Sequence, residues 1–256
     1  VGLNLNSSAR IGEPPYFVVE GDEYDTAFFD KGPKFLHYRP NSVILGPVEF
    51  DHADIYRDLA HVMSSFERLV DIIPADGLLV ACSDSENVRK LLSRARCRVV
   101  TYGIRPGADY RAYAAGISEN GVEFGLNVRS NPVEQAFRSF LYGEHNLQNT
   151  AGVMALLIEL GIPVEKIAKG LESFNGVKRR QEIRGIVNGI TVIDDFAHHP
   201  TAIRETIRAM KMRYPSSRLI SVFEPRSNTS RRNVFQNELP GAFAGSDISI
   251  IANPFK

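Results

Sequence analysis

Short apolar runs alternate with amphipathic, helix-patterned segments along most of this chain, and this alternation constrains the fold more than any other feature. The run at 78–82 (LLVAC) is continuously apolar, as in a strand that is buried on both faces. The segment before it has the apolar spacing of one helix face, formed by Ile55, Leu59, Val62, Met63, Phe66, Leu69 and Val70. Repeated strand–helix units predict a parallel sheet covered by helices, and therefore an α/β protein.

The other elements are predicted from the same patterns. Strands are expected at 17–20, 42–45, 97–102, 190–193, 219–223 and 248–251. Helices are expected at 55–70, 85–95, 145–160, 163–174, 201–212 and 234–243. Looser alternation around Asn120-Gly121 predicts an antiparallel hairpin at 110–128, and a second hairpin is expected to turn at 130–132.

The periodicity stops at 175–180 (NGVKRR), which we take as a domain boundary. At roughly 100–200 residues per domain, 256 residues fit two domains, and we expect them at 1–178 and 179–256. The strands and helices that follow the boundary have the order βαβαβ, which predicts a small parallel sheet.

Composition excludes several classes of partner. Thirty basic residues balance 30 acidic ones, so no strong field favours nucleic acid or an anionic membrane. No apolar run approaches the ~20 residues of a membrane span. Cys82 and Cys97 lack metal-binding spacing and are typical of thiols in a reducing compartment, which predicts a cytoplasmic protein.

Four strings carry the candidate chemistry, and each lies where a strand or loop meets a helix, the place where α/β folds bind ligands. They are EGDEYD at 20–25, DHAD at 51–54, GEHNLQN at 143–149 and DDFAHHP at 194–200. Together they supply the carboxylates, imidazoles and amides of a nucleotide- and magnesium-dependent enzyme. A G-x-x-x-x-G-K-[ST] phosphate loop does not occur in the sequence.

The order of these strings, followed through GVKRRQE (176–182) and EPRSNT (224–229), resembles the muramyl (Mur) ligase family over nearly the whole chain. Within that family, FFDKGPKFLHY (28–38) and EPRSNT resemble the branch that acts in murein recycling. The resemblance implies a central ATP-binding domain that lacks its phosphate loop, followed by part of a Rossmann-like C-terminal domain. We expect the chain alone to be a truncated, inactive part of the enzyme.

The resemblance also implies a reaction. An ATP- and Mg²⁺-dependent ligase would join UDP-N-acetylmuramate to the murein tripeptide L-Ala-γ-D-Glu-meso-diaminopimelate in peptidoglycan recycling. ATP would convert the carboxylate into an acyl phosphate, which the peptide amine attacks. Catalysis of this kind depends on positioning and charge neutralisation, and not on a Ser/His/Asp nucleophile set.

The resemblance makes Glu20, the first acid of EGDEYD, and His52 the candidate metal ligands. Four acids in six residues repel one another unless a cation neutralises them, and their oxygens suit Mg²⁺, although the string alone would be typical of a solvated acidic turn. A neutral imidazole is an unusual ligand for a hard ion. The metal role of His52 is therefore implied by the resemblance alone.

His145, Asn149, Arg180 and Asp195 are the candidate ATP-binding residues. His145 and Asn149 are four residues apart and share one helix face, and an amide suits the edge of adenine. The resemblance directs Arg180 to the phosphates and Asp195 to the ribose. An ordinary charge run at a hinge is the alternative for Arg180.

The remaining expectations concern catalysis and substrate binding. Arg180, Asp195 and His198 are expected to be catalytic. Substrate binding is expected of His199, Glu224, Arg226, Ser227 and Asn228. A mixture of acid and base suits a zwitterionic diaminopimelate end, while a salt-bridged loop is an equal alternative for 224–228.

Three alternative functions remain open. The nearest is an alanine-adding ligase of the same fold. A metal-dependent phosphoesterase is suggested by DHAD, GEHN and HH, but the order G-D-x-H and G-N-H-[ED] is lacking. A plain binding module is the third.

Overall fold

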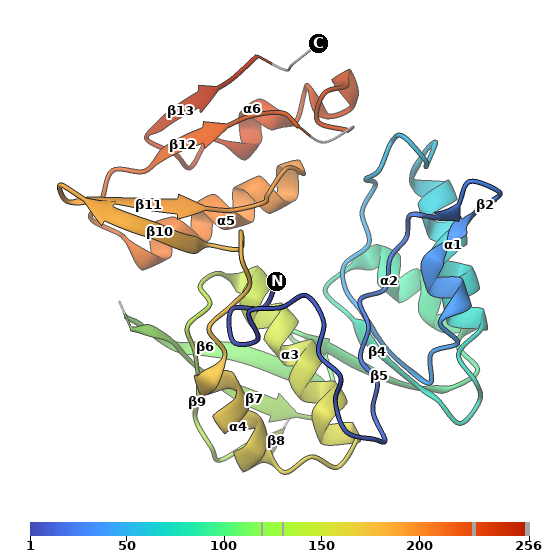
Figure 1. Cartoon of the computed structure of the whole chain (residues 1–256). Coiled ribbons are helices and arrows are strands. Elements are labelled where there is room, and N and C mark those ends of the chain that lie inside the picture. The colour runs from blue at the N-terminus through green and yellow to red at the C-terminus, as the bar shows by residue number, and fades with distance from the viewer. Residues whose placement is uncertain (119, 130, 227–228, 254–256) are drawn as a thin grey trace.

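The computed structural model describes residues 1–118, 120–129, 131–226 and 229–253. Its main body is a seven-stranded sheet of order β3-β4-β5-β6-β7-β8, with β9 also paired to β7 (Figure 1). The strands are β3 (Ser42–Leu45), β4 (Leu78–Cys82), β5 (Arg98–Gly103), β6 (Tyr110–Ser118), β7 (Gly121–Val128), β8 (Asn131–Pro132) and β9 (Phe137–Ser139). Strands β3 to β6 run parallel, and β7 pairs antiparallel with β6, β8 and β9. The predicted α/β fold and the hairpin at 110–128 are confirmed. Strands β7 and β8 also pair, but Asn131 and Pro132 belong to β8 and not to its turn as predicted, and Ser130 lies outside the described residues.

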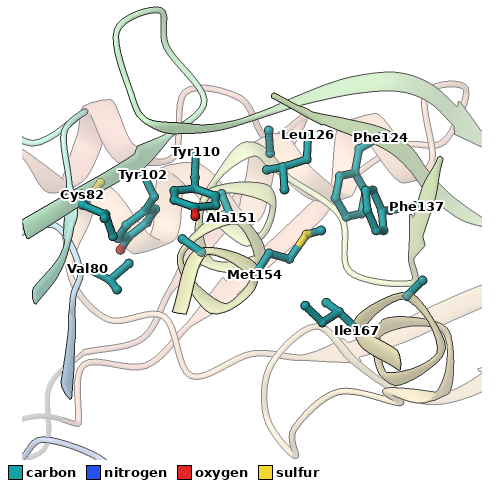
Figure 2. Packing of buried hydrophobic residues seen from close by; sticks show 14 of the residues in the cluster. Val80, Cys82, Tyr102, Tyr110, Phe124, Leu126, Phe137, Ala151, Met154 and Ile167 are labelled. Atoms are coloured by element: carbon teal, nitrogen blue, oxygen red, sulfur yellow. The ribbon is translucent and has the colours of Figure 1, made fainter. Parts of the chain in front are cut away.

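Helices cover both faces of the sheet, because successive side chains of β4 point to opposite sides. Leu79 and Ala81 join the core beneath α1 (Leu59–Asp71) and α2 (Glu86–Leu91). Val80 and Cys82 join the core beneath α3 (Glu144–Glu159) and α4 (Val164–Ser173). Figure 2 shows this second core, in which Tyr102, Tyr110, Phe124 and Phe137 lie over Met154 and Ile167.

Local capping explains where the helices begin. The Asp58 side chain accepts a hydrogen bond from the backbone amide of His61, so α1 starts at Leu59 and not at Ile55 as predicted. Helix α2 is shorter than predicted and continues as a 3₁₀ turn, η2 (Leu92–Arg94). None of the described helices is long and apolar enough to cross a membrane.

The C-terminal part consists of β10 (Glu182–Val187), β11 (Ile190–Asp194), α5 (Pro200–Arg213), β12 (Ile220–Phe223), η3 (Asn233–Phe235), α6 (Leu239–Ala242) and β13 (Ile248–Ile251). Strands β12 and β13 pair in parallel, as predicted. The prediction that β11 joins the same parallel sheet is wrong within the described residues, because β11 pairs antiparallel with β10. Asn188 and Gly189, with φ of 49° and 77°, form the tight turn of this hairpin.

The predicted strand at 17–20 is also wrong. Phe17 and Val18 are 89% and 92% exposed, and no described strand pairs with them. A three-residue apolar run does not form a stable strand unless a neighbouring strand pairs with it. The strands in this region are instead β1 (Asp25–Ala27) and β2 (Asp30–Pro33), a small hairpin followed by η1 (Lys34–His37).

Close packing between α3 and the sheet gives a stability prediction. A Cβ added at Gly152 would lie 2.8 Å from Cζ of Tyr102, whose ring is buried in the core. We expect Gly152→Ala to lower the free energy of unfolding by about 1–3 kcal/mol, although alanine is the better helix former. Gly170→Ala in α4, which meets open space, should instead raise it by up to about 1 kcal/mol. Urea denaturation of both variants distinguishes the two effects, and equal stabilisation would contradict the packing argument.

Candidate active site

One cavity of about 1060 Å³ lies between the main sheet body and the C-terminal part. Its walls come from the loop between β3 and α1, from α3, from the segment that joins the two parts, and from the start of α5. Six of the predicted site residues line it: His52, His145, Asn149, Arg180, Asp195 and His199. Sites at the junction of two parts are a common location for ligands.

His145 lies in the first turn of α3 and is partly buried in the cavity wall. Gly143 precedes the helix with φ of 98°, and a Cβ there would lie 2.8 Å from the His145 ring, so glycine permits this arrangement. Burial lowers the pKa of His145, against the opposing charges of Glu205 and Asp195. Its Nδ1 is buried and has no hydrogen-bond partner among the described residues. Such a group is unusual in a folded protein and points to a missing partner.

The three amides of the GEHNLQN string have different surroundings. Asn146 donates to the Tyr142 carbonyl at 2.8 Å, and Gln148 donates to Asp84 Oδ2 at 2.8 Å. The side chain of Asn149 is exposed to the cavity and hydrogen-bonds to no other described residue. Asn149 is therefore the amide of this string that is available to a ligand.

Asp195 joins the connecting segment to the C-terminal part. Its Oδ2 accepts from the backbone amide of Gln181 at 2.9 Å, and its Oδ1 accepts from the amide of Ala197 at 2.8 Å and from Thr206 Oγ1 at 3.3 Å. Arg180, directly before Gln181, lies with its guanidinium 5.7 Å from the centre of the Phe196 ring and is otherwise exposed. The structure thus brings Arg180 and Asp195 to the cavity as predicted.

His52 lies in the loop between β3 and α1 and has a left-handed backbone, with φ of 53°. Its Nε2 is 2.6 Å from Glu23 Oε1, and its ring packs 4.4 Å from that of Tyr24. Burial opposes its charge, but the hydrogen bond to Glu23 and the charges of Asp51 and Asp54 raise the pKa of His52 overall. Burial likewise opposes the charge of Glu23, and the bond to His52 lowers the pKa of Glu23 overall.

The two histidines of DDFAHHP are held differently. His198 lies outside the cavity lining; its Nδ1 donates to the Phe196 carbonyl at 2.9 Å and its Nε2 is 3.9 Å from Asp51 Oδ2. His199 lines the cavity, but its Nε2 donates to the Phe50 carbonyl at 3.1 Å. They do not form a metal pair, in agreement with the sequence-based interpretation that adjacent histidines point apart.

The remaining predicted residues lie outside the cavity lining. Glu20 is exposed in an irregular segment, so its metal role stays a prediction. Glu224 and Arg226 pair with each other at 2.7 Å, as the salt-bridged alternative predicts. Ser227 and Asn228 lie outside the described residues. No cluster of three His, Cys, Asp or Glu side chains suited to a metal ion occurs within the described parts of the chain.

Glu23, Glu49, Gln181 and Glu205 are among the cavity residues that were missed as site candidates. Glu23 belongs to the acidic string, and Gln181 follows the basic run, so both lie within strings that had already been recognised. Glu49 lies two residues before DHAD, in the run EFDHADIY that also carries the resemblance. Glu205 lies in no such string, and only the folded chain brings it to the cavity.

Two family models match this chain. Residues 4–157 match the Mur ligase middle domain, and residues 179–252 match the Mur ligase glutamate ligase domain. The chain belongs to the Mur ligase family. The UDP-N-acetylmuramate–L-alanyl-gamma-D-glutamyl-meso-2,6-diaminoheptandioate ligase of Haemophilus influenzae is 36% identical over 98% of this chain and 55% of that protein.

Further relatives of the chain are also muramyl ligases. The UDP-N-acetylmuramate–L-alanine ligase of Clostridium tetani is 34% identical over 97% of this chain and 52% of its own length. The crystal structure of a murein peptide ligase of Psychrobacter arcticus is 32% identical and covers 92% of this chain and 48% of that one, with a TM-score of 0.65. This Mur ligase chain therefore spans about half the length of the relatives it matches.

The Glu23–His52 pair gives a pH prediction. The raised pKa of His52 means that its contribution to stability is complete below the unfolded value of about 6.5 and is lost as the pH rises through the folded pKa. The lowered pKa of Glu23 gives a contribution that is present above about 4.3 and is lost on acidification. The pair is thus most stabilising between about pH 4.3 and 6.5.

We expect Glu23→Gln to lower the pKa of His52, because burial of the ring remains while its charge partner is removed. Titration of the His52 ring by NMR measures this shift. Glu86→Gln, which removes a carboxylate paired with Lys90 on α2, is the matched control and should leave His52 unchanged. An unaltered His52 titration in Glu23→Gln would show that the pair does not set its charge.

Proposed function

We propose that this chain forms the nucleotide-binding cavity of an ATP-dependent ligase that joins UDP-N-acetylmuramate to L-Ala-γ-D-Glu-meso-diaminopimelate. The observation that carries the proposal is the shared cavity, in which buried His145 Nδ1 and the Asn149 amide have no described hydrogen-bond partner, next to the exposed guanidinium of Arg180. The printed names of relatives in Haemophilus influenzae and Escherichia coli, both 36% identical, support this choice of substrates.

Adenine is the proposed ligand of His145 and Asn149. The side-chain amide nitrogen of Gln181, Nε2, lies 3.5 Å from His145 Nε2. Because an amide nitrogen can only donate, His145 Nε2 is the acceptor in this contact and the ring proton is placed on Nδ1. Adenine presents ring-nitrogen acceptors and an exocyclic amino donor. A buried Nδ1–H donor and a carboxamide with both a donor and an acceptor complement that edge.

The phosphates are proposed to lie toward Arg180 and His52, which both line the cavity. Arginine is suited to bidentate phosphate contact. Mg²⁺ commonly takes one or two protein ligands and completes its shell with phosphate oxygens and water. The Glu23 carboxylate beside His52 fits such a partial site, and Glu20 remains a further proposed ligand; Mg²⁺, when bound, would neutralise phosphate charge.

The chain's own groups would then position the reactants. An oxygen of the substrate carboxylate attacks the γ-phosphorus of ATP, ADP leaves, and an acyl phosphate forms. The peptide amine attacks the acyl carbon, loses a proton, and phosphate leaves as the amide forms. Arg180 would balance the charge of the phosphoryl group, which is the kind of electrostatic contribution that dominates phosphoryl transfer. Asp195 would hold the connecting segment that carries Arg180. A catalytic role for His198, which lies outside the cavity lining, stays a prediction.

The peptide acceptor is proposed to meet Glu224 and Arg226, together with Ser227 and Asn228. Breaking the Glu224–Arg226 pair would supply one group of each sign for a zwitterionic end. An alanine-adding ligase is the second candidate function, because relatives with that printed name are 33–34% identical over nearly the whole chain.

Removal of the available amide tests the nucleotide site. We expect Asn149→Ala to raise the KM for ATP about 5- to 100-fold in the native protein, which corresponds to about 1–3 kcal/mol for the loss of amide contacts to the base. Asn237→Ala, on an exposed turn of the C-terminal part, is the control and should leave the KM unchanged. Steady-state ADP release measures both; a normal KM for ATP in Asn149→Ala would exclude this residue from the base site.

The acceptor decides between the two candidate functions. We expect kcat/KM for the tripeptide to exceed that for L-alanine, because remote carboxylates of the peptide can form charge-assisted hydrogen bonds worth about 1.5–3 kcal/mol each. L-Alanine offers no such remote group. ADP formation with UDP-N-acetylmuramate and each acceptor in turn measures the ratio, and a preference for L-alanine would assign the protein to the alanine-adding ligases.

A further inference from the structure

The loop at 49–53, which carries His52, is hydrogen-bonded on the N-terminal side of His52 to the start of α5. His199 Nε2 donates to the carbonyl of Phe50 at 3.1 Å. Thr201 Oγ1 donates to Glu49 Oε2 at 2.7 Å. Both donors belong to the C-terminal part, and both acceptors precede His52 in the chain.

On the C-terminal side of His52, the same loop is hydrogen-bonded to the segment after β12. Ala53 N donates to Thr229 Oγ1 at 3.2 Å, and the Thr229 side chain is buried, with 3% of the residue exposed. Arg232 donates from its guanidinium to the Ala53 carbonyl at 3.1 Å. The contacts therefore hold the main chain on both sides of His52.

Phe235 closes the contact with an apolar layer. Its ring centre lies 4.7 Å from that of His199 and 6.3 Å from that of Phe50, in edge-on geometry. Phe235 is buried. Aromatic edge contacts of this kind exclude water from the hydrogen bonds next to them and strengthen the whole arrangement.

His199 has no ring nitrogen left for a substrate. Its Nε2 is a donor to Phe50, and its Nδ1 accepts from the backbone amide of Thr201 at 3.3 Å as the cap of α5. The Nδ1 atom also lies 3.5 Å from Glu49 Oε2, so both ring nitrogens face groups of the protein. The geometry gives His199 a positioning function instead of a direct substrate contact.

The main chain at His52 needs such support. A φ of 53° is uncommon for residues other than glycine, and unusual backbone conformations persist only where the surroundings over-determine them. Within its own loop, the His52 amide is bonded to Asp51 Oδ1, and its carbonyl accepts from Ile55 and Tyr56. The Phe50 carbonyl and the Ala53 amide and carbonyl are hydrogen-bonded, among the described residues, only by groups of the C-terminal part, while the Phe50 side chain also packs against the sheet-body core.

We propose that His199, Thr229 and Arg232 are positioning residues that fix the His52 loop when the C-terminal part docks, so that the imidazole meets Glu23. Docking and occupation of the His52 end of the cavity are then coupled, and each favours the other by the same factor. The metal side of this coupling rests on the proposed function, whereas the docking contact itself does not.

Hydrogen–deuterium exchange of the 256-residue chain tests the docking contact without any activity. Thr229→Val keeps the shape but removes the acceptor for the Ala53 amide. We expect exchange in the peptide 50–56 to become at least tenfold faster, while the β4 strand stays protected. Thr229→Ser should restore the native rate, and Thr191→Val in β11, the matched control, should not alter it. An unchanged rate in Thr229→Val, or equal acceleration in Thr229→Ser, would overturn the proposal.

A second variant decides the case in which Thr229→Val also loosens β4. Arg232→Gln removes the guanidinium that binds the Ala53 carbonyl from an exposed position. Faster exchange confined to peptide 50–56 in that variant supports the proposed positioning of the His52 loop, and an exchange rate equal to that of the wild type contradicts it.

Kinetics of the native protein test the coupling. Thr229→Val is expected to raise the KM for Mg²⁺ about tenfold and to leave the KM for UDP-N-acetylmuramate unchanged. Equal KM values for Mg²⁺ in the variant and the wild type would overturn the coupling. Absence of ADP formation in the wild type would instead contradict the proposed function. The exchange experiment does not depend on activity and would still test the docking contact.

Discussion

The hydrogen bonds of the Asp195 carboxylate are the interaction on which the candidate site depends, because they fix the connecting segment to the C-terminal part at the cavity. One of its oxygens holds the amide of Gln181 in the connecting segment, and the other holds Ala197 and Thr206 in the C-terminal part. The connecting segment passes through left-handed backbone at Arg179 and Gln181, with φ of 59° and 50°, so its path is sharply bent. A carboxylate that accepts several backbone and hydroxyl donors is well suited to hold such a bend. Asp195 thereby helps to fix the wall that carries Arg180, together with the hydrogen bond from the Gln181 side chain to the Tyr142 carbonyl.

The division between engaged and available polar groups assigns the roles around the cavity. Asn146, Gln148 and His199 lie in the recognised strings, but each is hydrogen-bonded within the chain. Asn149 and His145 Nδ1 lie in the same strings and have no described partner. Sequence alone does not separate these two groups, because both kinds of residue have the same side-chain chemistry. The engaged residues shape the site, and the available ones are left to bind a ligand.

Much of the fold was predictable because its signals are local. The buried run of β4 and the apolar stripe of α1 are each contained in one segment, and the parallel sheet follows from their alternation. The strand expected at Phe17 and Val18 failed because pairing, which is non-local, decides whether a short apolar run forms a strand. Strand β10 was missed although Asn188-Gly189 is a hairpin signal. Within the acidic string, the structure pairs Glu23 with His52, a choice among neighbouring acids that only the path of the loop determines.

The central claim is that ATP occupies the cavity between the sheet body and the C-terminal part. Photolabelling of the native protein with an ATP analogue that carries an azide on adenine, followed by peptide mapping, tests it most directly. If adenine lies against His145 and Asn149, the label should appear on peptides covering 144–150 and 176–181, and excess ATP should abolish it. Labelling confined to other peptides, such as those of β6 and β7, would contradict nucleotide binding in this cavity.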